Sequence, residues 1–154
     1  MATQSAPPVL TELKLSPALK DTINNALSNG RMLSLAYVSP EGRPELSFRG
    51  SVQAYSDTQL AIWVRNPQGG LIEAVKRGHP HVTLLYGVLG EQKAFMTFRG
   101  RARIETAEAA RRKVYDSSPE LERNLDKDRG GVPVIIDLDS VDGLHGGNVL
   151  KMRR

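Results

Sequence analysis

The chain has 154 residues, of which 40% are hydrophobic and 25% charged, and its net charge at pH 7 is +4. These values are typical of one soluble globular domain. The sequence contains no cysteine, which excludes disulfides and thiolate metal sites. It shows neither an apolar run of the roughly 20 residues that a membrane span needs nor a basic-then-apolar secretory leader, so we expect a cytoplasmic protein without membrane contacts.

The basic residues are spread along the chain, with small groups at residues 99–103, 111–113 and 151–154. A basic surface is only an electrostatic footprint, and an anionic cofactor or substrate accounts for the same charge balance. We therefore do not expect nucleic acid to be the partner.

The first elements are an arm and a helix. Residues 1–15 contain two prolines and little periodicity, which predicts a flexible or loosely docked arm. A helix is predicted to begin at Ser16, a capping residue, and Pro17, and to end at Asn29 and Gly30. Its apolar face would carry residues spaced four apart, namely Leu19, Ile23 and Leu27.

Residues 16–154, which include that helix, are predicted to form one mainly β (α+β) domain. Alternating apolar residues bounded by turn residues predict strands at residues 32–39, 44–55, 59–65, 81–89, 92–105, 133–139 and 148–153. Helices are predicted at residues 70–77, at residues 107–115 with Thr106 as the cap, and after Ser118 and Pro119. Successive hairpins predict a small antiparallel barrel or a strongly bent sheet.

No established catalytic or phosphate-binding motif is present: the sequence lacks GxGxxG after a strand, a P-loop, HExxH and GxSxG. His79 and His81 flank Pro80 without a third metal ligand, so we expect no metal site there. His145 lies in a glycine-rich segment predicted to be a flexible loop, with no orienting partner evident. Catalytic residues therefore stay unknown.

A group of arginines, glycines and one tryptophan is the strongest indication of a ligand. Arg49 and Arg65 carry the guanidinium groups that proteins favour for phosphate oxygens. Trp63 lies two residues before Arg65 on the same strand face, and could be either a core residue or the wall of a groove. Gly69 and Gly70 open a predicted helix, which is either an ordinary turn or a phosphate site. Together these residues suit a flat, phosphorylated ligand.

Five pieces of the sequence, in this order, resemble the pyridoxamine 5'-phosphate oxidase-like family. They are RP at residues 43–44, FRGS at 48–51, LAIWVR at 60–65, HPHVTLLY at 79–86 and FRGRA at 98–102. The similarity covers about residues 17–115. Members of this family are split barrels that bind flavin mononucleotide (FMN), and their relatives include general-stress flavoproteins and deazaflavin-dependent reductases.

The resemblance implies a six-stranded antiparallel split β-barrel with flanking helices, which dimerises with itself and holds FMN between the subunits. On this basis the flavin would run along four consecutive residues, with the phosphate near the first of them: Arg49, Gly50, Ser51 and Val52. The next strand would contribute Trp63, Val64 and Arg65. A helix start would receive the phosphate on Gly69, Gly70 and Leu71, and Phe95 would approach from the partner subunit.

One departure from the family pattern affects the cofactor assignment. Many flavin-binding members carry a lysine, or a Ser/Thr-Arg-Lys sequence, where this chain has residues 67–71, which include no cation. Lys76 and Arg77 follow about one and a half helical turns later and would substitute only after rearrangement. A deazaflavin, another anionic cofactor or an empty groove are therefore alternatives to FMN.

The leading hypothesis is an FMN-binding oxidoreductase that acts on a small organic substrate. Oxidation of pyridoxamine phosphate itself is not expected, because the C-terminal substrate segment of the true oxidases is not recognisable. The second hypothesis is a non-catalytic or sensor protein of the same fold that binds the deazaflavin F420 or haem, with His79, His81 or His145 as axial ligand. The third is a small barrel that binds anions or nucleic acid.

Overall fold

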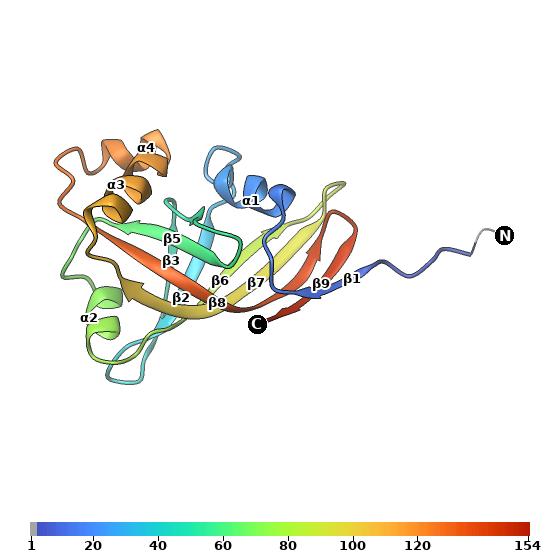
Figure 1. Ribbon diagram of the computed structural model, residues 1–154, viewed down its shortest axis with the longest axis horizontal. Coiled ribbons are helices and arrows are strands. Elements are labelled where there is room, and N and C mark those ends of the chain that lie inside the picture. Colours follow the sequence, from blue (N-terminus) through green and yellow to red (C-terminus); the bar gives the residue numbers. More distant parts are fainter. Residues whose placement is uncertain (1–2) are drawn as a thin grey trace.

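A computed structural model describes residues 3–154, which form one nine-stranded sheet and four helices (Figure 1). The helices are α1 (Pro17–Asn24), α2 (Gly70–Lys76), α3 (Glu108–Ser117) and α4 (Glu120–Asn124). The strands are β1 (Val9–Glu12), β2 (Leu33–Val38), β3 (Pro44–Arg49), β4 (Gln53–Ala54), β5 (Gln59–Val64), β6 (His81–Val88), β7 (Ala94–Ile104), β8 (Val132–His145) and β9 (Asn148–Arg153).

The sheet bends strongly but does not close, and it confirms the predicted split barrel. The strands follow the order β1-β9-β8-β7-β6-β2-β3, and every pairing except the parallel pairing of β1 with β9 is antiparallel. The long strand β8 pairs with β7 on one edge. On the other edge it pairs first with β5, through residues 132–137, and then with β9, through residues 140–145. This change of partner opens the barrel.

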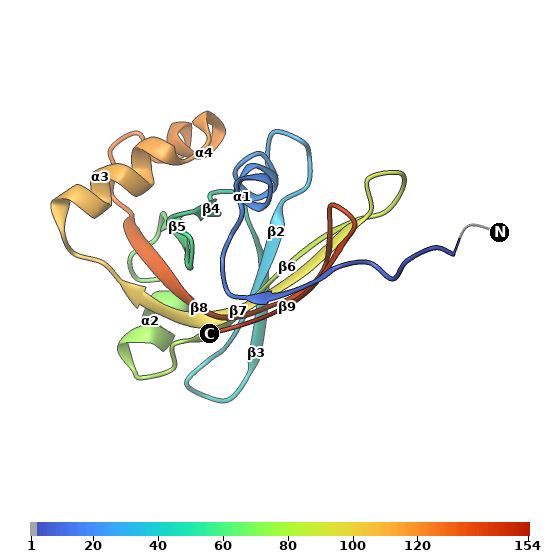
Figure 2. The same cartoon turned by 45° about the vertical axis from the view of Figure 1, so that its right-hand side comes forward.

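Two apolar clusters hold the fold together. The main core lies inside the bent sheet, where its largest buried side chains include Phe98, Leu35 and Ile62. A second cluster lies on the other face of β5 and β8 beneath α3, and consists of Ala61, Trp63, Val114, Tyr115 and Ile135. Figure 2 shows α3 and α4 above this part of the sheet.

The N-terminal segment is more ordered than the arm that the sequence predicted. Residues 9–12 form β1 on the edge of β9, and Leu13 and Leu15 are buried in the main core. The Leu15 N–H also donates a hydrogen bond to the Asp57 carbonyl, at 2.7 Å. Burial of these leucines explains the difference, because two residues are too few to show a period in the sequence.

The predicted strand over residues 44–55 is wrong, because the chain breaks after Arg49 into β3 and β4. The buried Ser51 hydroxyl lies at this break and bonds the backbone of Trp63, accepting from its N–H at 2.9 Å and donating to its carbonyl at 3.1 Å. A side chain thus takes the place of a ladder hydrogen bond at the turn.

Several predicted boundaries also move. Ser16 caps α1 as expected, but the helix ends at Asn24 and continues as turns to Gly30. The Thr106 cap is wrong: the Glu105 carboxylate accepts from the N–H groups of Thr106 and Ala107. The predicted loop around His145 is instead the end of β8 and a tight turn into β9. No helix in the described part of the chain is long and apolar enough to cross a membrane.

Candidate functional site

A pocket of about 320 Å³ gathers much of the predicted ligand site at one end of the sheet. It lies where β3 and β5 end and α2 begins. Six of the residues that the sequence assigned to the flavin line it, together with Asn66; they are Arg49, Val64, Arg65, Gly69, Gly70 and Leu71. We call it the arginine pocket.

The loop between β5 and α2 shapes the floor of the arginine pocket. The side-chain oxygen of Asn66 accepts a hydrogen bond from the Gln68 N–H at 3.0 Å. The backbone carbonyl of Asn66 accepts one from the Gly69 N–H, also at 3.0 Å. Gly69 then caps α2 without a side-chain hydrogen bond. A Cβ atom on Gly70 would collide with the Tyr37 hydroxyl, so a larger residue there would displace the end of the Tyr37 side chain. Gly69, with φ −71° and ψ 168°, is ordinary extended backbone, whereas Gly70 leaves room for the Tyr37 hydroxyl beside the pocket.

Arg49 is the most unusual residue of the arginine pocket. Its Nε is buried and has no hydrogen-bond partner among the described residues. Burial, and more weakly the positive charge of Arg65, lower the pKa of Arg49, while Tyr37 and Glu122 act in the opposite direction. Arginine nevertheless stays charged at neutral pH. A buried guanidinium nitrogen without a partner indicates that an acceptor is missing from the site.

Arg65 supplies the second positive charge. It follows the last residue of β5, its side chain is exposed, and it forms no ion pair with any residue of the described range 3–154. Arg49 and Arg65 are therefore two cations without an ion-pair partner among the described residues, which favours an anionic ligand.

Glu122 of α4 is the acidic neighbour of this pair. Its carboxylate lies against Gly50, where a Cβ atom would collide with it. It acts on Arg49 through space, but no hydrogen bond or ion pair joins the two side chains within the described residues. Glu122 therefore reduces the positive potential of the arginine pocket without filling it.

Trp63 does not line the arginine pocket. Its side chain is 4% exposed, meets the Tyr115 ring edge-on at 5.1 Å between centroids, and donates from Nε1 to Asp126 Oδ2 at 2.8 Å. Ser51 and Val52 are also buried, the first bonded to the backbone and the second within the main core. These three residues support the fold beneath the site.

Phe95 lies far along the sheet, near the start of β7, and is half-buried with the Lys93 ammonium 5.7 Å from its ring centroid. It takes no part in the arginine pocket of its own chain. It does lie on the same outer face of the sheet as Leu85, because Thr97 pairs with Leu85 and side chains alternate along β7.

The outer face of the sheet carries an apolar surface that the sequence analysis missed. Leu46 and Phe48 of β3 are 73% and 71% exposed, and Leu85 of β6 is 52% exposed. The pairings of Phe48 with Ser34, and of Ser34 with Leu85, place these side chains on one face. We call Leu46, Phe48 and Leu85 the apolar face. The alternation of β3 was the available signal, since it puts Leu46 and Phe48 together.

The cations suggested as substitutes for the absent lysine lie elsewhere. Lys76 ends the seven-residue helix α2, about 9 Å along the helix axis from Gly70. Arg77 pairs with Glu41 at 3.6 Å and with Glu73 at 3.9 Å. Neither residue lines the arginine pocket, so Arg65 is its second cation.

The three histidines are dispersed. His79 and His81 are exposed, and His145 is half-buried with Nε2 2.8 Å from the Thr22 hydroxyl. Over residues 3–154, no group of three His, Asp or Glu side chains is arranged to hold a metal ion.

Comparisons of sequence and of structure give different answers. No protein-family model matches the chain, and no curated protein matches its sequence. Solved structures do match it. HupZ of Group A Streptococcus superposes with a TM-score of 0.61 at 17% identity, over 87% of this chain and 97% of that one.

Two further structures point the same way. A Clostridium acetobutylicum protein of the pyridoxinephosphate oxidase family, related to general stress protein 26, gives a TM-score of 0.61 at 10% identity, over 87% of this chain and 95% of its own. General Stress Protein 26 of Bacillus anthracis gives 0.59 at 19% identity, over 82% and 93%. The chain has the pyridoxamine 5'-phosphate oxidase-like split-barrel fold. At these identities the likeness establishes the fold of this split barrel, and its ligand has to be argued from its own residues.

Proposed function

We propose that this split barrel binds FMN, with the phosphate in the arginine pocket and the ring system at the interface of a homodimer, and acts as a flavin-dependent oxidoreductase on a small organic substrate. The observation that carries the proposal is the buried Arg49 Nε without an acceptor, next to the unpaired Arg65. A phosphate supplies acceptor oxygens for both guanidinium groups.

The residues of the arginine pocket suit the phosphate end of a flavin nucleotide. Arg49 and Arg65 would bind the phosphate oxygens, while Val64 and Leu71 offer apolar contacts to the adjoining chain of the ligand. Bound flavin would supply the hydride or electron transfer, and these residues would bind and orient it.

The homodimer is the second part of the proposal. The apolar face of Leu46, Phe48 and Leu85 is a surface that a second copy would cover, and large exposed side chains grouped on one face commonly mark such contacts. Phe95 lies on this same outer face. In a dimer it would be the partner's aromatic residue beside the flavin.

The first experiment titrates FMN into the purified protein and follows quenching of flavin fluorescence. We expect Arg49→Gln to weaken binding by about 1.5–3 kcal/mol, the range for a hydrogen bond to a charged group. The matched control is Arg112→Gln, which removes an exposed arginine of α3 outside the pocket. Equal affinity of the Arg49→Gln variant and the wild type would place the flavin elsewhere.

The visible spectrum of protein purified without added ligand distinguishes the cofactors. Flavin maxima support the proposal, whereas a Soret band would indicate haem. If the protein is colourless and quenches the fluorescence of F420 but not that of FMN, the ligand of the arginine pocket would be a deazaflavin. Absence of binding to either flavin, with salt-sensitive binding to generic DNA, would favour the nucleic-acid alternative.

A further inference from the structure

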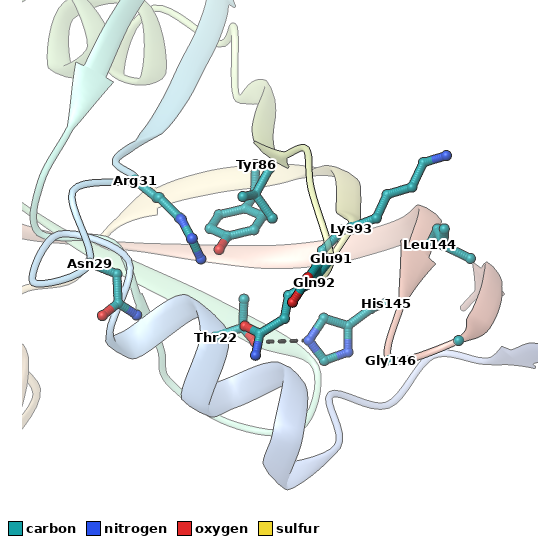
Figure 3. Close-up of a pocket in the computed structure, with 13 residues that line it drawn as sticks. Thr22, Asn29, Arg31, Tyr86, Glu91, Gln92, Lys93, Leu144, His145 and Gly146 are labelled. Atoms are coloured by element: carbon teal, nitrogen blue, oxygen red, sulfur yellow. Dashed lines mark hydrogen bonds between the residues drawn. The ribbon is translucent and has the colours of Figure 1, made fainter.

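A second and larger cavity, of about 590 Å³, lies at the end of the sheet opposite α2. The turns of the β6–β7 and β8–β9 hairpins and the segment around α1 surround it (Figure 3). The eight residues of β6 run from the α2 side to this cavity, a span of roughly 25 Å. It shares no lining residue with the arginine pocket, and we call it the hairpin cavity.

Tyr86 gives the hairpin cavity an unpaired hydroxyl. Its side chain is only 3% exposed and packs into the main core, yet its hydroxyl makes no hydrogen bond with any residue from 3 to 154. Figure 3 shows the hydroxyl at the end of the ring that faces the cavity. The hydroxyl is not among the buried polar atoms without a partner in the described residues, so it is open to the cavity and available to a ligand.

His145 supplies an acceptor on the other side. The Thr22 hydroxyl lies 2.8 Å from Nε2 of His145 and 3.2 Å from the Ala18 carbonyl oxygen, so when it donates to the carbonyl it accepts from Nε2–H. In that arrangement Nδ1 is an acceptor, and it makes no hydrogen bond with another residue of the described range. Burial lowers the pKa of His145, so the ring is neutral at pH 7.

Arg31 gives the hairpin cavity a cation that a carboxylate can meet. Arg31 and Lys93 both line it, and neither forms an ion pair with a residue of the described range. Figure 3 shows Arg31 beside the Tyr86 ring and Lys93 on the neighbouring hairpin turn. Glu91 is the one acidic residue that lines the cavity. The Lys93 ammonium points away from the cavity in Figure 3 and lies 5.7 Å from the Phe95 ring centroid, so Arg31 is the cation that a ligand in the cavity would meet.

We propose that the hairpin cavity binds a small organic carboxylate that also carries a hydroxyl or amino group. The carboxylate accepts hydrogen bonds from the Tyr86 hydroxyl and the Arg31 guanidinium, a combination that suits its planar fork. The hydroxyl or amino group donates to Nδ1 of His145. This site rests on its own residues and does not depend on flavin binding in the arginine pocket.

The test is an NMR titration of the full chain that follows backbone amide signals, with L-malate as the probe and succinate as the analogue without the hydroxyl. We expect malate to shift the signals of Arg31, Tyr86, Lys93 and His145 with saturation at millimolar concentration. Arg31→Gln and Tyr86→Phe should each lower the affinity for malate by about tenfold, because each removes a hydrogen bond to the carboxylate. Arg112→Gln, the control, should bind malate as the wild type does. Succinate should bind several-fold more weakly than malate.

Three outcomes would overturn the assignment. The first is the absence of saturable shifts around Tyr86 with malate and with L-glutamate, the amino-carboxylate probe. The second is unchanged malate affinity in both Arg31→Gln and Tyr86→Phe. The third is inorganic phosphate binding as tightly as malate, which would make this a site for simple anions. Arg31 is exposed, so the Arg31→Gln variant decides the test even if Tyr86→Phe disturbs the core.

Discussion

Arg49 and Glu122 set the potential of the arginine pocket at the scale of single residues. Arg49 has a buried nitrogen without an acceptor. Glu122 lies against Gly50 but forms no ion pair with Arg49. A carboxylate in that position attracts the guanidinium but repels an incoming phosphate. Glu122 therefore lowers the affinity of the arginine pocket for anions.

Replacing Glu122 should strengthen binding to the arginine pocket. We expect Glu122→Gln to tighten FMN binding by up to about 1 kcal/mol, the size of a charge interaction near a protein surface. Glu120→Gln is the matched control, since Glu120 lies at the start of the same helix and outside the pocket. Affinities are compared by fluorescence quenching at low and high salt. Weaker binding in Glu122→Gln would show that Glu122 orders Arg49 instead of opposing the ligand.

Asp126 is a structural carboxylate whose effect depends on pH. Burial alone would raise the pKa of Asp126, but hydrogen bonds from Trp63 Nε1 and from the N–H groups of Gly130 and Gly131 hold it below its ordinary value. Because the folded-state pKa is the lower one, the carboxylate stabilises the fold above the unfolded pKa of about 3.9. This stabilisation is lost as the pH falls through the folded-state pKa.

We expect Asp126→Asn to be less stable than the wild type at neutral pH, with the gap closing as the pH falls below about 4. Urea unfolding at a series of pH values measures the gap. Asp128→Asn is the control, because Asp128 is exposed and makes no side-chain hydrogen bond to another described residue. A gap that stays constant down to pH 3 would mean that the charge of Asp126 does not matter.

The sequence predicted part of the candidate site because chemistry and chain position agreed there. Arg49, Arg65 and Gly70 meet at the ends of two strands and the start of a helix. The pattern indicated the end of β5 and the start of α2, but it placed Arg49 inside a strand over residues 44–55. Trp63 was harder to place, since alternation puts it on the face of Arg65 but does not reveal that α3 covers it. The residues that bury it, Val114 and Tyr115, come about fifty positions later in the chain.

At the scale of elements, β8 decides the shape of the sheet. It carries β5 and β9 in succession on one edge, and Gly143 lies between β7 and β9. This strand was predicted only as far as residue 139, because polar residues and a glycine interrupt its alternation beyond that point. Pairing on both edges keeps the strand extended despite that composition.

Gly143 of β8 should be harder to replace than Gly42, a glycine of the turn between β2 and β3. Its φ of 141° disfavours other residues, and a Cβ atom would collide with the Phe95 carbonyl oxygen of β7. Gly42 also has a positive φ, of 83°, but open space around it. We expect Gly42→Ala to cost about 1 kcal/mol and Gly143→Ala at least about 2 kcal/mol more in urea unfolding. Equal losses would show that the sheet relaxes around the added methyl group.

At the scale of the whole molecule, the exposed apolar face and the incomplete flavin site are parts of one proposal. The arginine pocket holds only the phosphate end of a flavin nucleotide, so the ring needs a further wall. Leu46 and Phe48 are each more than two-thirds exposed on an edge strand. An uncovered edge with such side chains invites association, and a symmetric dimer would bury it.

A charge introduced into the apolar face should therefore both separate the subunits and weaken cofactor binding. We expect wild-type protein to sediment as a dimer and Phe48→Asp as a monomer, with an unchanged circular dichroism spectrum because Phe48 is 71% exposed in the single chain. FMN affinity should fall in the same variant, although Phe48 does not line the arginine pocket. Leu121→Asp is the control, since Leu121 is 60% exposed on α4 and is not one of the three residues of this face. A Phe48→Asp monomer with wild-type FMN affinity would confine the flavin to one subunit, and a wild-type monomer would refute the dimer.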